Sequence, residues 1–127
     1  QPEEMNKSIW LVHQPPTGLG MDICGDGQQV GSPAVLDFIN RYQPLCGVSG
    51  HIHESPYQRG GRWVGVAHDS LWFQPGQMGE RLHFVTVQTT AACNIRNILH
   101  SIFGPTPIEF ERFSEIGEAK PVGRPNS

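Results

Sequence analysis

Ser8-Ile9-Trp10-Leu11-Val12-His13 opens the stretch that decides the fold, and Leu45-Cys46-Gly47-Val48-Ser49-Gly50 closes it. Both are apolar runs of strand length, which is typical of strands covered on both faces in a sandwich or an α/β sheet. A helical pattern lies between them, so the order is strand, loop, helix, strand. This order is a crossover unit, and it predicts two parallel strands whose carboxyl ends lie on the same edge of the sheet.

The helix between the two runs has clear signals at both ends. Ser32 and Pro33 form a favourable N-cap and first-turn pair, and Pro44 stops the helix. Four apolar or aromatic residues fall on one face of this helix, namely Val35, Phe38, Ile39 and Tyr42. Before the helix, residues 14–31 are rich in proline and glycine without periodicity, which predicts a long loop of the kind that often carries function.

Histidines follow both predicted strands. His13 ends the first, and Gly50-His51-Ile52-His53 follows the second. On an extended segment, side chains two positions apart point to the same side, and neutral imidazole is a leading nitrogen ligand for divalent metals. The glycine at position 50 would allow a tight turn there. His13, His51 and His53 are therefore predicted to converge as metal ligands at one edge of the sheet.

Several other polar residues have simpler interpretations. A His-x-His pair alone is frequently structural, and Glu54 suits the start of a helix. Gly25-Asp26 suits a turn. His68, His83 and His100 have no partner at a ligand spacing, so partial exposure or structural hydrogen bonding is expected for them.

Downstream of the histidines, short strands are predicted at Trp63–Ala67, Leu71–Phe73 and Leu82–Gln88. Residues 91–103 are ambiguous: Ile95, Ile98, Leu99 and Ile102 have helical spacing, which favours a helix, but a hairpin fits as well. A last strand is expected at Ile108–Phe113, and 118–127 is expected to be a flexible tail.

Composition limits the classes of function. The chain has 127 residues, which suits one domain, and a net charge of −3 with only nine Lys and Arg, so neither nucleic acid nor a membrane surface is an expected partner. The three cysteines are widely spaced and form no Cys-x-x-Cys, which favours a reducing, cytoplasmic setting. No apolar stretch of membrane-spanning length or export signal is visible.

Two other families that use paired histidines do not fit. A cupin needs a glutamate four or five residues after the second histidine, where this chain has Tyr57 and Gln58. A metallo-β-lactamase pattern needs Asp and His where Ser55 and Pro56 stand.

The chain does resemble the C-terminal half of the calcineurin-like metallophosphoesterases. The resemblance covers roughly residues 8–88 and is carried by Leu11-Val12-His13-Gln14-Pro15-Pro16, Gly31-Ser32, Gly50-His51-Ile52-His53-Glu54 and Phe73-Gln74-Pro75-Gly76. It implies an α/β (α+β) fold, the C-terminal half of a four-layer α/β/β/α sandwich. It also implies that His13 and His51 bind one metal and His53 a second, with both divalent ions drawn from Mn, Fe, Zn or Ni. The implied activity is two-metal hydrolysis of a phosphate ester.

The family's upstream motifs, which supply the bridging aspartate, an asparagine ligand and the general acid, do not occur in the chain. Residues 1–127 are therefore expected to be a single, partial domain that contributes the histidine half of the site, contains no general acid and is inactive alone. The partner would be the N-terminal half of the same protein or another chain, and a homo-oligomer is also compatible. The alternative is a non-catalytic partial domain used for protein association or weak metal binding.

Overall fold

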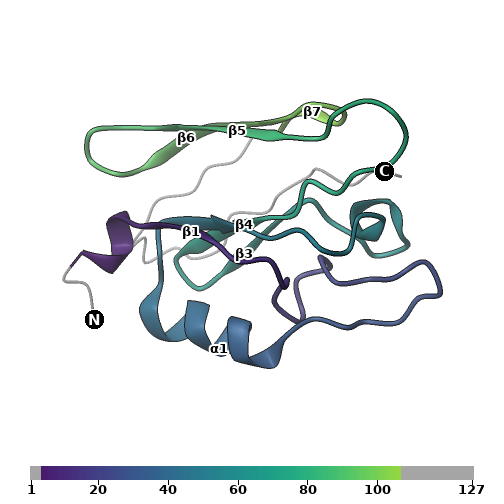
Figure 1. The fold of residues 1–127 in the computed structure, drawn as a ribbon. Coiled ribbons are helices and arrows are strands. Elements are labelled where there is room, and N and C mark those ends of the chain that lie inside the picture. Colours follow the sequence, from purple (N-terminus) through teal and green to yellow (C-terminus); the bar gives the residue numbers. More distant parts are fainter. Residues whose placement is uncertain (1–3, 107–127) are drawn as a thin grey trace.

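The computed structural model describes residues 4–106, which form a mixed α/β structure with one α-helix and two sheets. The elements in chain order are η1 (Met5–Lys7), β1 (Ile9–Leu11), α1 (Pro33–Tyr42), β2 (Cys46–Val48), η2 (Ser55–Tyr57), β3 (Val64–Ala67), β4 (Ser70–Phe73), β5 (Val85–Thr89), β6 (Ile95–His100) and β7 (Gly104–Thr106). Figure 1 shows three layers, with α1 below the first sheet and the second sheet above it.

The first sheet has the strand order β1-β2-β4-β3. Strands β1, β2 and β4 are parallel, while β3 pairs antiparallel with β4 through a tight connection. The predicted crossover of strand, loop, helix and strand is thereby confirmed. Strand β2 spans only Cys46–Val48, within the predicted range of Leu45 to Ser49.

Helix α1 begins and ends where its sequence signals predict. The Ser32 hydroxyl accepts a hydrogen bond from the Val35 N–H, and Pro33 occupies the first turn. At the other end Gln43 adopts a left-handed conformation with φ 47°, and its N–H bonds to the Ile39 carbonyl. Pro44 follows directly.

The second sheet is antiparallel, with the order β5-β6-β7. The prediction of a helix within 91–103 is wrong, because Ile95–His100 is strand β6 and the hairpin alternative holds. An irregularity in the β5–β6 pairing leaves Arg96 without an opposite residue, so Ile95 and Ile98 are both buried although three positions apart. The bulge therefore gives Ile95 and Ile98 the three-residue spacing that is typical of a helix face. Strand β5 begins at Val85, three residues after the predicted start at Leu82.

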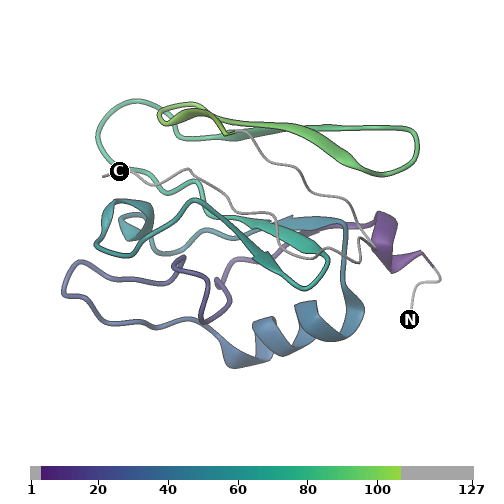
Figure 2. The ribbon, with the colours of Figure 1, turned by 180° about the vertical axis from the view of Figure 1, so that it is seen from behind.

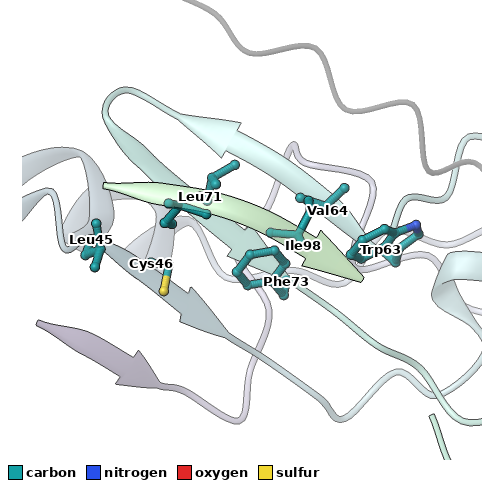
Figure 3. Close-up of a cluster of buried hydrophobic side chains, with 8 residues drawn as sticks. Leu45, Cys46, Trp63, Val64, Leu71, Phe73 and Ile98 are labelled. Carbon is teal, nitrogen blue, oxygen red and sulfur yellow. The ribbon is translucent and has the colours of Figure 1, made fainter. Parts of the chain in front are cut away.

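Two hydrophobic clusters hold the layers together. One lies between the two sheets and contains Leu45, Cys46, Trp63, Val64, Leu71, Phe73, Ile95 and Ile98, most of which are labelled in Figure 3. The other lies on the opposite face of the first sheet and contains Met21, Ile39, Ala67 and Trp72. Figure 2 shows the same arrangement from behind, with α1 and the second sheet on opposite faces of the first sheet.

Strand β1 is less covered than its apolar sequence predicts. Ile9 and Leu11 are 59% and 81% exposed, while Trp10, on the other face, packs against Phe38 of α1 with ring centroids 4.4 Å apart. The expectation of a strand covered on both faces is therefore wrong for β1. Among the described residues β1 is an edge strand of the first sheet, and Ile9 and Leu11 belong to neither hydrophobic cluster.

The strand expected at Ile108–Phe113 and the tail expected at 118–127 lie outside the described residues. Within residues 4–106, no helix has the length and apolar character needed to cross a membrane.

Candidate metal site

The parallel pairing of β1 and β2 continues beyond both strands and brings two histidines together. The Val12 N–H bonds to the Val48 carbonyl at 3.0 Å, and the Gly50 N–H bonds to the His13 carbonyl at 3.1 Å. The next residue is His51, whose Nδ1 lies 2.9 Å from Nε2 of His13. The prediction that His13 and His51 share one sheet edge is confirmed.

The loop after β2 is not extended, however, so the predicted same-side projection of His51 and His53 does not apply. His51 has a φ of 68°, in the left-handed region, and the Ile52 N–H turns back to the Gly50 carbonyl at 2.7 Å. The tight turn therefore falls on His51 itself, where the sequence suggested Gly50. Both His51 and His53 are exposed.

His53 is not brought into the pair as a third ligand. Among residues 4–106, no three His, Cys, Asp or Glu side chains are grouped closely enough to hold a metal ion. The structure brings together His13 and His51, and His53 lies two residues further along the same loop, where its carbonyl accepts the Gln77 N–H at 2.9 Å.

The two ring nitrogens lie near the separation that a shared ion requires. Imidazole nitrogens bind zinc at about 2.0–2.1 Å, so two of them on one tetrahedral ion lie about 3.3 Å apart, somewhat further than in this pair. The observed 2.9 Å is also a hydrogen-bond distance, in which one ring nitrogen donates and the other accepts. A small widening of the pair would let both nitrogens bind one divalent cation in place of their mutual hydrogen bond, and a complete site would need further ligands.

Hydrogen bonds from Trp72 of β4 and from Gln74, the residue that follows β4, support both histidines, and little in the sequence signals them. The Trp72 indole N–H donates to the Ser49 hydroxyl at 2.9 Å, and that hydroxyl donates to the carbonyl of Gln14, next to His13, at 3.2 Å. The side-chain amide of Gln74 donates to the carbonyl of Gly50, next to His51. The only sequence signal was the position of Gln74 in Phe73-Gln74-Pro75-Gly76.

The carboxylates of the loop before α1, and that of Glu54 in the loop after β2, accept hydrogen bonds from backbone N–H groups. Asp22, which is 1% exposed, accepts the Gly31 N–H at 2.8 Å, and Glu54 accepts the Gly25 N–H at 3.1 Å. The Asp26 carboxylate accepts the Gln28 N–H, which confirms the turn expected at Gly25-Asp26. Asp22 was not singled out from the sequence, because nothing in its neighbours marks it as buried.

The thiol of Cys24 lies near these carboxylates. The pKa of Cys24 is raised, first by loss of solvation and then by the negative charges of Glu54, Asp26 and Asp22. Both effects disfavour the thiolate, which is the form that binds metal, relative to that of an unperturbed cysteine.

A second group of histidines joins the two sheets. His100 is fully buried, donates from Nε2 to the Pro75 carbonyl at 2.8 Å, and accepts the Ile102 N–H at Nδ1 at 3.0 Å. His83 donates from Nδ1 to the Arg81 carbonyl and accepts the Tyr57 hydroxyl at Nε2. Partial exposure or structural hydrogen bonding was expected for both; the second alternative is confirmed, and both side chains are buried.

The hydrogen bonds of His100 favour a neutral ring. Burial is the main cause that lowers the pKa of His100, with a smaller lowering from His83 and an opposing effect of the Pro75 carbonyl. Burial likewise raises the pKa of Tyr57. With both nitrogens of each ring already bonded to protein groups, this cluster serves structure and leaves His13 and His51 as the candidate site.

Comparison of the chain with protein-family models, curated proteins and solved structures finds no match. Function must therefore be inferred from the residues themselves.

Proposed function

We propose that the chain supplies the histidine half of a metal site in a metal-dependent phosphoester hydrolase, with His13 and His51 binding one divalent cation. The observation that supports this most directly is the 2.9 Å separation of their ring nitrogens at the carboxyl ends of two parallel strands. Ligand sites in open α/β sheets form at such ends, and the resemblance to calcineurin-like metallophosphoesterases assigns the same two histidines to one metal.

In this proposal His53 binds a second cation, and carboxylates from outside residues 4–106 complete both coordination shells. The three layers α1, first sheet and second sheet would be part of a four-layer α/β/β/α sandwich. When bound, a pair of divalent cations would activate a water molecule and neutralise charge on a phosphoryl group. The chain's own contribution is to hold imidazole nitrogens in place on two strand ends.

Metal titration tests the first part of the proposal. Zn²⁺ or Mn²⁺ binding to the chain, measured by calorimetry, should weaken by at least about tenfold in His13→Ala or His51→Ala. The double variant should bind at least as weakly as either single variant, because it retains neither ligand of the pair. His68→Asn is the matched control, since it removes an exposed histidine away from the pair. Equal affinity in the wild type, both single variants and the double variant would rule out the His13–His51 site.

Hydrolysis tests the second part. In the intact gene product, p-nitrophenyl phosphate hydrolysis should require divalent metal and should fall with His13→Ala, His51→Ala and His53→Ala. The assignment to this class of enzyme would be contradicted if the intact protein contained no bound metal and did not hydrolyse p-nitrophenyl phosphate, and if His53→Ala changed neither result.

Strand β1 favours a second candidate function, which is association with another protein. Ile9 and Leu11 are exposed, and within residues 4–106 β1 is an edge strand, so its apolar surface is suited to contact with another strand. Sedimentation over a range of protein concentrations should then show association that Leu11→Lys abolishes. Leu82→Lys, at a side chain that is 71% exposed before β5, is the control. Association that both variants leave intact would exclude β1 as the contact.

A further inference from the structure

Gln74 is a buried amide at the end of β4, directly linked to the loop that carries His51. It is 1% exposed, although glutamine is usually a surface residue. A buried amide is retained at little cost only when its donors and acceptor are bonded, and the partners of Gln74 are all backbone groups of nearby loops.

Three loops meet at this side chain. Nε2 donates to the carbonyl of Gly50 and, at 3.4 Å, to the carbonyl of Met21, while Oε1 accepts the Gly76 N–H at 3.2 Å. The amide therefore joins the loop after β2, the loop before α1 and the turn after β4.

Gly50 transmits this restraint to both histidines. Its N–H bonds to the His13 carbonyl at 3.1 Å, and its carbonyl accepts both the Gln74 amide and the Ile52 N–H. The carbonyl of Gly50 belongs to the peptide unit that leads into His51, so these bonds fix the orientation of that unit. A fixed peptide unit is what a histidine with φ 68° needs, because residues other than glycine rarely occupy the left-handed region without support.

The turn after β4 acts on the same loop from its other side. The Gln77 N–H bonds to the His53 carbonyl at 2.9 Å, and a Cβ at Gly76 would lie 2.8 Å from that carbonyl oxygen. By accepting the Gly76 N–H, Gln74 holds this turn against the loop. Both ends of the segment His51–His53 are thus connected to one side chain.

We propose that Gln74 is a positioning residue for the histidine pair, keeping His51 in its left-handed conformation so that its Nδ1 faces His13. As a role in metal binding, this inference rests on the proposed function, but the position of the His51 ring is a property of the metal-free protein. Gln74→Met removes the amide donor and acceptor while filling a similar volume.

The test uses two readouts on the folded protein. The His13 and His51 ring centroids are 4.7 Å apart, so in the metal-free wild type their ring protons should give a nuclear Overhauser cross-peak. Metal-free Gln74→Met should give no such cross-peak. Zn²⁺ affinity should fall about 10–100-fold in the same variant, the usual effect of removing a group that orients a ligand.

Ser70→Ala is the matched control. Ser70 is also buried on β4 and donates to a backbone carbonyl, that of Pro44, but at the opposite end of the strand. It should keep the cross-peak and bind Zn²⁺ within about twofold of wild type, because it touches no group that orients the pair. A Gln74→Met protein that also keeps both would overturn the inference.

Two further outcomes are informative. If Gln74→Met does not fold, the test is made on the wild type by measuring the scalar coupling across the hydrogen bond from Gln74 Nε2 to the Gly50 carbonyl. A measurable coupling supports the inference, and no coupling overturns it. If the wild type binds no Zn²⁺ but the cross-peak depends on Gln74, the metal proposal fails while the positioning role stands.

Discussion

Gly47 and Gly50 lie three residues apart, but a side chain would meet very different surroundings at each. A Cβ at Gly47 would lie 2.2 Å from the ring of Trp72, which crosses β2 at this position. A Cβ at Gly50 would meet nothing within 4 Å. The glycine that the packing requires is therefore the one inside the strand.

This difference predicts the effects of two alanine substitutions. Gly47→Ala should lower the free energy of unfolding by about 1–3 kcal/mol, because the Trp72 ring must shift within a packed cluster. Gly50→Ala should change it by less than about 0.5 kcal/mol. Urea denaturation measures both. Equal losses would mean that the Trp72 ring does not lie against Gly47 in solution.

At the level of elements, helix α1 depends on a single side-chain cap. The Ser32 hydroxyl accepts the Val35 N–H at 3.1 Å, which satisfies one of the free N–H groups of the first turn. Ser32→Ala should destabilise the protein by about 0.5–2 kcal/mol, measured by thermal or urea unfolding. Ser32→Asp preserves a side-chain oxygen and should recover most of the loss. Ser32→Ala with unchanged stability would show that the cap does not hold this helix.

The elements also show which features a sequence can predict. Helix α1 and the parallel pair β1 and β2 were predictable, because Ser32-Pro33, Pro44 and the apolar runs are local signals. Strand β6 was not, because the bulge at Arg96 is produced by pairing with β5 and gives Ile95 and Ile98 a helix-like spacing. For the site, the nearness of His13 and His51 followed from strand order. The left-handed turn at His51 depends on contacts with distant residues, which no short pattern reports.

At the level of the whole molecule, His100 connects the second sheet to the loop after β4. Its Nε2 donates to the Pro75 carbonyl, and its Nδ1 accepts the N–H groups of Ile102 and Phe103, an arrangement that needs a neutral ring. Because burial lowers the pKa of His100 below its ordinary 6.5, the unfolded chain takes up a proton more readily than the folded one as the pH falls.

Stability should accordingly be full above pH 6.5 and should decrease as the pH falls below that value toward the lower pKa of the folded state. Urea midpoints at a series of pH values between 7.5 and 5 would measure this decrease. His100→Gln, which keeps a donor near Pro75 but does not titrate, should flatten it. His68→Asn, at an exposed position, is the control and should retain the wild-type slope. A slope that His100→Gln leaves unchanged would assign the effect to other groups.

The two hydrophobic clusters contain different tryptophans. Trp63 lies between the sheets, whereas Trp72 and the partly buried Trp10 lie on the side of α1. The tryptophan emission of the chain therefore combines signals from two different regions of the fold. Trp63→Phe would leave emission only from the helix side, and Trp10→Phe combined with Trp72→Phe would leave emission only from between the sheets. Whether the two signals change together on denaturation would report whether the layers separate in one step or in sequence.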